Sequence, residues 1–556
     1  MTSPFDRIRP AAVTPRQVTD LALAFGLAVP GSDATVTCVA SDNRVVADGD
    51  LFVALPGTRA HGARFAADAV ARGATAVLTD AEGAALLAGP AGDAGDESRA
   101  GDESRAAPGT GLGVPVLVAP DPRSILGRVA AWVVGNPADR LMTFGVTGTN
   151  GKTTTTYQLA HLLRALGWKG GLVGTVETRS GDRVLPSRLT TPEAADLQAV
   201  LAAMLEDEVR TLAMEVSSHA LAQHRADGIV FGVAGFTNLS QDHLDFHGDL
   251  ESYFATKKQL FTPAHARRGV VTADDPWGVR LAQESEVPVA TLSTTGTATT
   301  TDAADWVVTD VAPSGTGSAF TVTHRDGRTL RTSTSLPGAY NVANAALALV
   351  MVLEGGADVR DVAEALDASG GLAATVPGRM EVVATSPRVV VDFAHNTEAL
   401  ALALDALRPT TAGRLAVVFG ATGDRDPGKR PLMGAAAVAG ADVVYVTDDD
   451  PHDEDPAAVR AAVLDGARAE LVLGDRDVTL HEVAPREEAI RAAVRDAAPA
   501  DTVLVAGRGH ETIQEIAGVD HALDDRVEAR AALAARGDAV MVPAQVTGKQ
   551  HERTTA

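Results

Sequence analysis

Gly148, Gly151, Lys152 and Thr153 have the types and spacing of a loop that binds nucleotide phosphates, within the segment GVTGTNGKTTTT at 145–156. The glycines let backbone amides point at phosphate oxygens, and the lysine supplies a cation for the β- and γ-phosphates. The threonine hydroxyl is a ligand for Mg²⁺. The alternative is an ordinary glycine turn before a threonine-capped helix. Because an apolar run precedes the loop and helical spacing follows it, the sequence predicts that the chain binds ATP or GTP.

A second group of polar residues, NLSQDHLDFHG at 238–248, is dense in metal-binding side chains. His243 and His247 are four residues apart, like two zinc ligands on one helix face, but Leu244 stands where a zinc peptidase has glutamate. Beside a nucleotide, oxygen ligands for Mg²⁺ are the better expectation, and Glu215 at a strand end can supply one. A solvated loop after a strand is the alternative.

Three polar loops follow predicted strands in the last part of the chain, at 423–430, 447–456 and 507–511. The middle loop, TDDDPHDEDP, is rich in carboxylates and could form a pocket for a cationic group. Because the carboxyl ends of parallel strands meet at one edge of a sheet, the three loops are expected to share a site. An acidic, solvated turn is the alternative.

The elements that would position these residues divide the chain into three units, so the predicted fold class is α/β with three domains. An N-terminal mixed α/β domain is expected at 1–137, a central phosphate-loop domain with a parallel sheet at 138–377, and a C-terminal Rossmann-like, doubly wound domain at 378–540. Short alternations at 286–335 predict an antiparallel excursion from the central sheet. The tandem GDESRA repeat within 92–107 predicts a disordered insert, and 541–556 a polar tail.

The overall composition restricts the partners of the chain, which has 72 acidic and 48 basic residues among 556 and a formal net charge of −24. This charge argues against non-specific binding of nucleic acid or of an anionic membrane. Cys38 is the single cysteine, so internal disulfides and cysteine-rich metal sites are excluded and a cytoplasmic location is expected. The first residues show no leader pattern, and no apolar run approaches the ~20 residues of a membrane span. We expect small-molecule partners, no membrane insertion and a monomer.

The ordered set of motifs resembles the Mur ligases, and within them the tripeptide-forming members, over nearly the whole chain. The motifs are GTNGKTT (148–154), MEVSSHAL (214–221), NLSQDHLDFHG (238–248), Lys257, GAYNVANA (338–345), PGRME (377–381), DFAH (392–395), GATGDRDPGKRP (420–431) and GRGHE (507–511). The resemblance implies that a diamino acid is added to the D-Glu γ-carboxylate of UDP-MurNAc-L-Ala-D-Glu, with ATP as co-substrate and Mg²⁺ as cofactor. An acyl phosphate would be the intermediate, and the product a peptidoglycan precursor.

The resemblance also implies roles for individual residues. Catalysis would involve Lys152, His243, Lys257 and Arg379. ATP would be bound by Gly148, Thr149, Asn150, Gly151, Lys152, Thr153, Thr154, Asn344, Arg379 and Asp392. Mg²⁺ would be held by Thr153, Glu215, His243 and Lys257, the lysine being carbamylated (N6-carboxylysine). The UDP-MurNAc-dipeptide would contact Asn43, Arg44, His61, Gly62, Ala63, Thr190, Thr191, Ser217, Gln223 and Arg225. The amino acid would contact Arg425, Asp449, Asp450, His452, Gly507 and Glu511.

The informative departure from the family pattern is Asp449-Asp450-Pro451-His452. Members that use meso-diaminopimelate usually have Asp-Asn-Pro-Arg there, where asparagine and arginine bind the distal carboxylate. An added anion and a lost permanent cation disfavour a carboxylate and suit an ammonium. We therefore expect L-lysine, followed by L-ornithine and then meso-diaminopimelate.

Two other kinds of protein share parts of the pattern. Folylpolyglutamate synthase and the ligase that adds D-Ala-D-Ala have the same phosphate loop, but the former usually lacks a separate domain before it. A non-enzymatic nucleotide switch would bind GTP through an Asn-Lys-x-Asp motif, and this sequence contains none.

Overall fold

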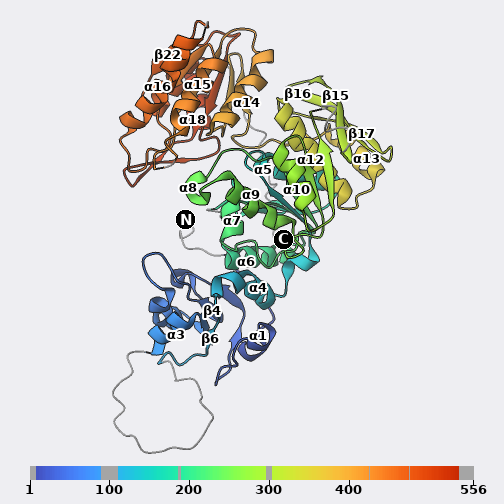
Figure 1. Cartoon of the computed structure of the whole chain (residues 1–556), viewed down its shortest axis with the longest axis vertical. Coiled ribbons are helices and arrows are strands. Elements are labelled where there is room, and N and C mark those ends of the chain that lie inside the picture. Colours follow the sequence, from blue (N-terminus) through green and yellow to red (C-terminus); the bar gives the residue numbers. More distant parts are fainter. Residues whose placement is uncertain are drawn as a thin grey trace, which may run out of the picture.

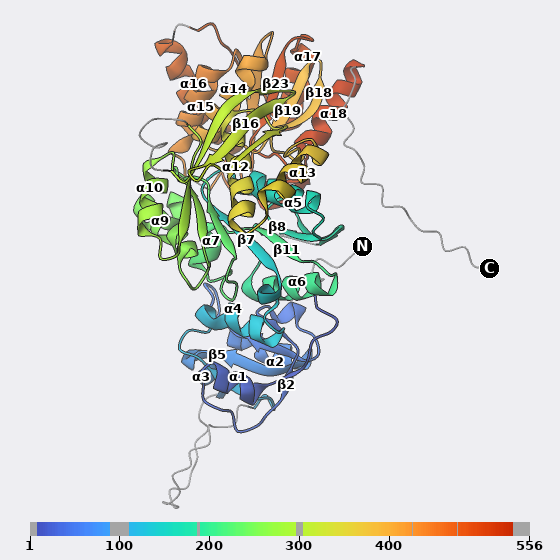
Figure 2. The same ribbon diagram turned by 90° about the vertical axis from the view of Figure 1, so that its right-hand side faces the viewer.

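The computed structural model describes residues 8–88, 111–185, 189–295, 304–424, 426–474 and 476–537. Three bodies are stacked along the long axis of the molecule, with the N-terminal body at one end and the C-terminal body at the other (Figures 1 and 2). Each body is built on its own main sheet, as expected from the sequence. The predicted insert at 92–107, the tail at 541–556 and Arg425 lie outside the described residues.

The N-terminal body has a four-stranded parallel sheet in the order β3-β4-β5-β6. Its strands are Cys38–Ala40, Asp50–Val53, Ala74–Thr79 and Val116–Val118. A two-stranded ribbon, β1 (Arg16–Gln17) with β2 (Thr35–Val36), lies beside it. The helices are α1 (Val18–Ala24), α2 (Ala66–Ala71), α3 (Ala81–Ala88) and α4 (Pro122–Val133), with 3₁₀ turns at Asn43–Val45, Gly62–Phe65 and Pro137–Arg140. Every residue of β3 and β4 is buried, which fits their mainly apolar character, and the one charged residue, Asp50, pairs with Arg9.

The central body contains an eleven-stranded sheet in the order β10-β9-β8-β11-β7-β12-β13-β14-β15-β16-β17. Its strands are β7 (Met142–Thr147), β8 (Gly170–Val173), β9 (Thr178–Ser180), β10 (Arg183–Leu185), β11 (Thr211–Glu215), β12 (Val233–Phe236), β13 (Gly269–Thr272), β14 (Val289–Ser293), β15 (Trp306–Ser314), β16 (Gly317–His324) and β17 (Thr329–Thr334). The run from β8 to β15 is parallel, and hairpins flank it on both sides.

The expected antiparallel excursion at 286–335 is therefore only partly right. The strand β14 pairs in parallel with β13, and β15 begins in parallel register with β14, so both belong to the central sheet. Only β15, β16 and β17 pair with one another in antiparallel fashion. Trp306 at the start of β15 is 1% exposed and packs in the main core, which anchors the hairpin to the sheet.

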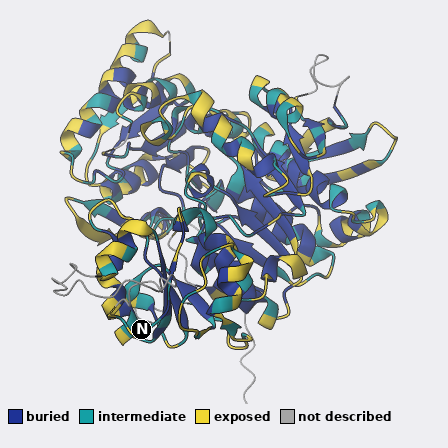
Figure 3. Ribbon diagram, turned by 60° about the horizontal axis from the view of Figure 1, so that its bottom comes forward, coloured by how far each residue is buried: buried dark blue, intermediate teal, exposed yellow. Residues whose placement is uncertain are grey.

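Helices cover both faces of the central sheet. They are α5 (Lys152–Ala165), α6 (Ala194–Glu206), α7 (Ser218–Ala222), α8 (Leu244–His247), α9 (Leu250–Lys258), α10 (Pro276–Glu284), α12 (Ala339–Glu354) and α13 (Val359–Ser369), with a 3₁₀ turn at Gln259–Phe261. The helices α5 and α12 pack against each other, and most residues of both are buried; α12 is mainly apolar, whereas α5 also buries its four threonines. Figure 3 shows the buried strands enclosed by helices whose outer faces are exposed.

The C-terminal body is doubly wound, with the strand order β18-β19-β23-β20-β21-β22. The strands are Glu381–Thr385, Arg388–Asp392, Thr502–Ala506, Leu415–Phe419, Val443–Val446 and Thr479–Glu482, in that order, and only the edge strand β18 is antiparallel. A hairpin of β24 (Ile513–Ile516) and β25 (Val519–Ala522) follows β23. The helices are α14 (Thr397–Leu407), α15 (Lys429–Gly440), α16 (Pro456–Leu473), α17 (Arg486–Asp496) and α18 (Asp525–Arg536), with a 3₁₀ turn at Arg408–Thr410.

A fully buried ion pair fixes the loops at the carboxyl edge of this sheet. Arg486 Nη2 lies 2.7 Å from Asp525 Oδ2, and both side chains are 0% exposed. The same guanidinium donates to the carbonyl oxygens of Ala506 and Asp448. Since removal of one partner from a buried pair costs roughly 3–5 kcal/mol, this arginine holds two loops of the predicted amino-acid site firmly in place.

Among the described residues, no helix is long and apolar enough to cross a membrane.

Candidate active site

The phosphate loop connects β7 to α5, as the sequence predicts. Gly148 and Gly151 have φ values of 147° and 88°, which side chains rarely tolerate. A Cβ at Gly151 would stand 2.2 Å from Asn344 Oδ1 of α12, so only glycine fits there. Lys152 Nζ donates to the carbonyl oxygens of Gly148 and Thr149 at 2.9 and 2.8 Å. The loop thus presents backbone amides and one cation at the start of a long helix, where an anion is stabilised.

Beside the loop, a hydroxyl and a carboxylate form an oxygen-rich group. Thr153 Oγ1 donates to Glu215 Oε2 at 2.9 Å, and Glu215 also accepts from the amide of Thr175 at 2.8 Å. Arg379 Nη2 reaches Thr153 Oγ1 from the C-terminal body at 3.4 Å. Among the described residues, no three His, Cys, Asp or Glu side chains are grouped so that they could hold a metal alone. A Thr–Glu pair of hard oxygen donors next to a phosphate loop fits Mg²⁺ when phosphates complete the coordination.

Lys257 also contacts the phosphate loop and is 1% exposed. Its Nζ donates to the Gly148 carbonyl at 2.7 Å and stands 4.3 Å from the centre of the Tyr253 ring. Burial, together with the nearby Lys152 cation, holds the pKa of Lys257 well below its usual value. A neutral amine is the form that reacts with CO₂, so this environment suits carbamate formation.

His243, the other predicted metal ligand, packs against Tyr253 with ring centres 6.3 Å apart. Burial lowers the pKa of His243 to about 4, so its ring is neutral at pH 7 and can act as a ligand. The ring of His247 also packs against Tyr253, with centres 4.8 Å apart, and its Nε2 lies 3.0 Å from Ser218 Oγ. Both histidine rings therefore lie against Tyr253 and His219.

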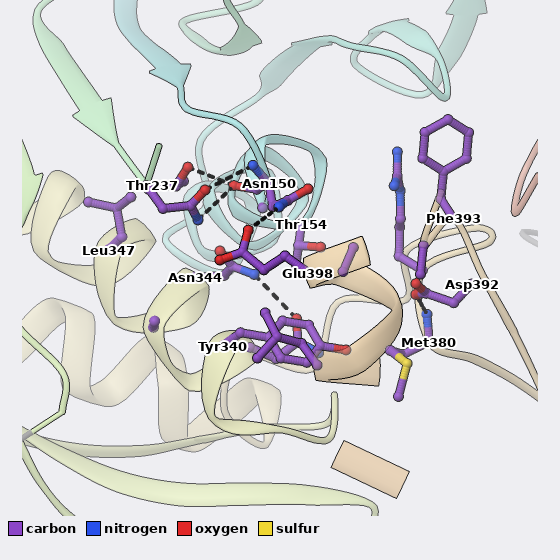
Figure 4. Close-up of a pocket in the computed structure, with 18 of the residues that line it drawn as sticks. Asn150, Thr154, Thr237, Tyr340, Asn344, Leu347, Met380, Asp392, Phe393 and Glu398 are labelled. Atoms are coloured by element: carbon purple, nitrogen blue, oxygen red, sulfur yellow. Dashed lines mark hydrogen bonds between the residues drawn. The ribbon is translucent and has the colours of Figure 1, made fainter. Parts of the chain in front are cut away.

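A cavity of about 160 Å³ lies next to the phosphate loop (Figure 4). The end of β19 and the segment before β18 line one side, where Asp392 accepts from the Met380 amide at 2.6 Å and Arg379 lies 4.0 Å from the centre of the Phe393 ring. The helix α12 lines the other with Asn344, whose side chain donates to Asn341 at 3.3 Å. A pocket lined by apolar side chains together with amide, hydroxyl and charged groups, beside a phosphate loop, suits a nucleoside.

A larger cleft of about 960 Å³ joins the central and C-terminal bodies. It brings together most residues that the sequence assigned to different substrates, namely Thr149, Asn150, Gly151, Lys152, Thr153, Thr154, Thr190, Thr191, Glu215, Ser217, Arg225, His243, Lys257, Arg379, Asp449, Asp450, His452, Gly507 and Glu511. Gln223 and the N-terminal residues Asn43, Arg44, His61, Gly62 and Ala63 do not line it. The phosphate loop, the candidate metal ligands His243 and Lys257, and the acidic loop thus face one cavity.

Arg225 is oriented by a residue that sequence reasoning missed. Its Nε lies 2.9 Å from Glu193 Oε1, and its Nη2 donates to Gln223 Oε1 at 2.6 Å. Gln223 is therefore linked to the cleft through Arg225. Thr191 Oγ1 donates to the Glu215 carbonyl at 2.8 Å, which connects this segment to the Thr153–Glu215 pair. In the sequence, only the position of Glu193 directly after Thr190-Thr191-Pro192 could have indicated that it belongs to this site.

In the N-terminal body, the His61 ring is fully engaged within the protein. Its Nδ1 accepts from the Ala63 amide at 3.0 Å, so Nε2 carries the proton and donates to Asp80 Oδ1 at 3.0 Å. The ring shapes the turn around Gly62, whose own amide donates to the Leu55 carbonyl at 2.8 Å. Arg44 forms a close ion pair with Asp42 at 2.6 Å, and both are partly exposed. Asp80 was not predicted.

The acidic loop after β21 has its negative charge partly neutralised by the guanidinium of Arg508, a side chain that is 0% exposed. Asp450 Oδ1 accepts from Arg508 at 2.6 Å and from the Glu515 amide at 2.9 Å. Asp449 Oδ2 is buried without a hydrogen-bond partner among the described residues, and a Cβ at Gly507 would stand 2.5 Å from it. Burial and Asp449 raise the pKa of Glu511 to about 8. The sequence did not anticipate that Asp450 would be paired, because Arg508 lies 58 residues further along the chain.

Comparison with known proteins agrees with this geometry. Residues 35–105 match the model of the Mur ligase family, catalytic domain, residues 146–352 that of the Mur ligase middle domain, and residues 378–509 that of the Mur ligase, glutamate ligase domain. The UDP-N-acetylmuramyl-tripeptide synthetase of Leifsonia xyli is 45% identical, covering 97% of this chain and all of the relative. The UDP-N-acetylmuramoyl-L-alanyl-D-glutamate–2,6-diaminopimelate ligase of Streptomyces avermitilis is 45% identical, covering 94% and 98%.

A solved structure of a UDP-N-acetylmuramoyl-L-alanyl-D-glutamate–2,6-diaminopimelate ligase is also similar, with 31% identity and a TM-score of 0.59. The match covers 91% of this chain and 96% of that one. The agreement of motifs, fold and cleft leads to one conclusion. The chain belongs to the Mur ligase family and is an ATP-dependent ligase that joins an amino acid to a UDP-MurNAc peptide.

Proposed function

We propose that the ligase adds L-lysine to the D-Glu γ-carboxylate of UDP-MurNAc-L-Ala-D-Glu, with ATP converted to ADP and phosphate. The observation that carries this proposal is the single cleft shared by the phosphate loop, the Thr190–Thr191 segment and the acidic loop. The N-terminal body would bind the UDP moiety, the central body ATP, and the C-terminal body the amino acid. The proposed domain limits are those expected from the sequence, 1–137, 138–377 and 378–540.

The reaction needs two steps, because a carboxylate has no good leaving group. First, a γ-carboxylate oxygen attacks the γ-phosphorus of ATP; an O–P bond forms, the bond to the β-phosphate oxygen breaks, and ADP leaves. The neutral α-amine then attacks the acyl carbon, the C–O bond to the phosphoryl group breaks, and phosphate leaves as the nitrogen loses a proton. The protein's part is to align these groups and to neutralise charge with Lys152 and Arg379.

The remaining site assignments belong to this proposal. Thr153 and Glu215 would hold one Mg²⁺, and Glu215, His243 and carbamylated Lys257 a second. When bound, Mg²⁺ would offset negative charge on the phosphates. Asn344 and Asp392 would contact adenosine, and Thr190, Thr191, Ser217, Gln223 and Arg225 the MurNAc-dipeptide. Asn43, Arg44, His61, Gly62 and Ala63 would surround UDP. Gly507 and Glu511, together with Arg425, would bind the α-amino and α-carboxylate groups of the amino acid.

The charges near the acidic loop support an amino acid that ends in an ammonium. Asp449, Asp450 and Glu511 contribute three carboxyl groups around Arg508, whose charge is shared with Asp450. His452 stands where the family's diaminopimelate enzymes usually have arginine. A distal carboxylate would therefore meet acidic groups and no permanent cation from this loop. The relative in Streptomyces avermitilis is named for 2,6-diaminopimelate, which makes that amino acid the alternative to test.

The test is phosphate release with UDP-MurNAc-L-Ala-D-Glu, ATP and one amino acid at a time. We expect the highest kcat/KM with L-lysine, lower values with L-ornithine, and the lowest with meso-diaminopimelate. Turnover with meso-diaminopimelate and none with lysine would overturn the choice of lysine and leave the ligase reaction standing. A non-enzymatic switch would bind nucleotide without any dependence on the amino acid.

A further inference from the structure

The hairpin of β24 and β25 lies directly against the loop that carries Asp449, Asp450 and His452. The Gln514 side chain donates to the Asp449 carbonyl, and the Glu515 amide donates to Asp450 Oδ1 at 2.9 Å. The His452 backbone pairs with β24 as a short parallel bridge, donating to the Glu515 carbonyl at 3.2 Å and accepting from Ala517 at 2.7 Å. The hairpin therefore determines where this loop stands.

Glu515 also holds the imidazole of His452. Its Oε2 lies 3.0 Å from His452 Nδ1, with the two side chains 43% and 25% exposed. An ionised carboxylate only accepts hydrogen bonds, so Nδ1 must carry the proton in this contact. In the neutral ring, Nε2 then has a lone pair. His452 lines the large cleft, and Nε2 is the ring nitrogen left for a ligand there.

The backbone of His452 shows that its position is imposed by its surroundings. Its φ of 50° lies in the left-handed region, which is uncommon for a residue with a side chain. Such a conformation persists where neighbouring contacts hold it, and here they come from the hairpin. Asp450 already accepts from Arg508 and from the Glu515 amide, so His452 is the better placed of the two to contact the amino acid.

We propose that Glu515 is a positioning residue that sets amino-acid specificity by fixing the orientation and tautomer of His452. This inference rests on the proposed ligation of an amino acid in the same cleft. In the neutral ring with Nδ1 protonated, Nε2 accepts a hydrogen bond from a distal ammonium and offers no proton to a distal carboxylate. The Glu515 charge acts in the same direction, because it offsets any positive charge on the ring.

The first experiment compares Glu515→Gln and Glu515→Ala with Asp520→Asn. Asp520 is the exposed cross-strand partner of Glu515 in the hairpin, so the control removes the same charge without touching His452. We expect both Glu515 variants to raise the KM for the amino acid about tenfold, as loss of one charge-assisted contact would. The kcat, the KM for ATP and the Tm should stay unchanged in both variants. In Glu515→Asp, the KM for the amino acid should lie between those of the wild type and Glu515→Ala.

A second experiment tests the pair directly. In His452→Arg alone, Glu515 would neutralise the new guanidinium, whereas in His452→Arg/Glu515→Gln the guanidinium could bind a carboxylate. We expect the preference for meso-diaminopimelate over lysine to rise more in the double variant than the two single changes predict together. Strict additivity would contradict the proposal.

A third measurement does not depend on activity. In ¹⁵N spectra of the free enzyme, we expect His452 to be the Nδ1–H tautomer and to lose that state in Glu515→Ala, which removes the acceptor. An unchanged tautomer, or an amino-acid KM that responds equally to Asp520→Asn, would overturn the role of Glu515. If the wild-type enzyme prefers meso-diaminopimelate, the proposed substrate fails, and the tautomer still tests Glu515 separately.

Discussion

At the scale of single residues, the structure changes which groups face the substrate. The sequence singled out Asp450 as an added anion for an ammonium, but Arg508 and the Glu515 amide occupy its Oδ1. Sequence reasoning also missed three residues that contact predicted site residues. Glu193 pairs with Arg225, Asp80 with His61, and Arg508 with Asp450. Each acts on a partner through space, and side-chain pairing of this kind leaves no spacing pattern in a sequence.

Lys257 provides a first prediction. Because burial and the nearby Lys152 cation hold the Lys257 pKa well below its usual value, the neutral amine that takes up CO₂ is favoured. Lys257→Ala should lower kcat at least 100-fold, and short carboxylic acids such as acetate should restore part of it by replacing the carbamate. The measurement is phosphate release with increasing acetate. Lys258→Ala is the matched control, since that neighbour pairs with Glu284 on the surface; equal losses in both variants would contradict the assignment.

Glu511 provides a prediction about pH. Its pKa of about 8 means that it is mostly neutral at pH 7 and becomes a carboxylate as the pH rises through 8. If it binds the α-ammonium, the KM for the amino acid should fall between pH 7 and pH 9, before the amine itself loses its proton. Glu511→Gln should raise the KM and remove this dependence. A wild-type KM that is flat over this range would argue against the contact.

At the scale of elements, the sequence predicted the sheets well because strand ends and glycine turns are local signals. The strand–loop–helix unit around Lys152 and the doubly wound C-terminal body are confirmed. The parallel attachment of β14 and β15 was not predicted, since it depends on Trp306 packing in a distant core. The hairpin of β24 and β25 was also missed, although it holds the predicted specificity loop.

The phosphate loop can be tested by a pair of glycine substitutions at the two ends of α5. Gly151→Ala would force a Cβ to within 2.2 Å of Asn344 Oδ1 at a φ of 88°, so we expect at least a tenfold rise in the KM for ATP. Gly167→Ala places a Cβ in open space at a φ of 80° and should cost about 1 kcal/mol of stability while leaving the KM unchanged. Isothermal titration with a non-hydrolysable ATP analogue measures the affinity of each variant for the nucleotide, and thermal unfolding measures its stability. Equal affinities in the two variants would contradict this account of the loop.

At the scale of the whole molecule, contacts between bodies bring the site together. Asn150 of the phosphate loop donates to Glu398 of α14 at 3.0 Å, and His395 Nε2 lies 3.8 Å from Asp242. On the other side, Glu206 of the central body accepts from the amides of Ala11 and Ala12 at 3.0 and 2.7 Å. The C-terminal body thus contacts the nucleotide site itself, which fits a closure over ATP. Contacts of this kind follow from the packing of whole domains and could not be predicted from motifs.

Removing the Asn150–Glu398 contact should weaken that closure. Glu398→Ala is expected to raise the KM for ATP several-fold and to increase the radius of gyration of the ATP-bound enzyme in solution scattering. Asp405→Ala, at an exposed position of the same helix, is the control and should change neither quantity. An unaltered radius and KM in Glu398→Ala would show that the contact plays no part in closure.

The central claim is that the γ-phosphoryl group of ATP is transferred to the substrate's γ-carboxylate before the amine attacks. It is tested most directly with UDP-MurNAc-L-Ala-D-Glu carrying ¹⁸O in that carboxylate, together with ATP and L-lysine. The account predicts that each phosphate released carries one ¹⁸O atom from the carboxylate. Phosphate without ¹⁸O, formed at the same rate as the tripeptide, would contradict it.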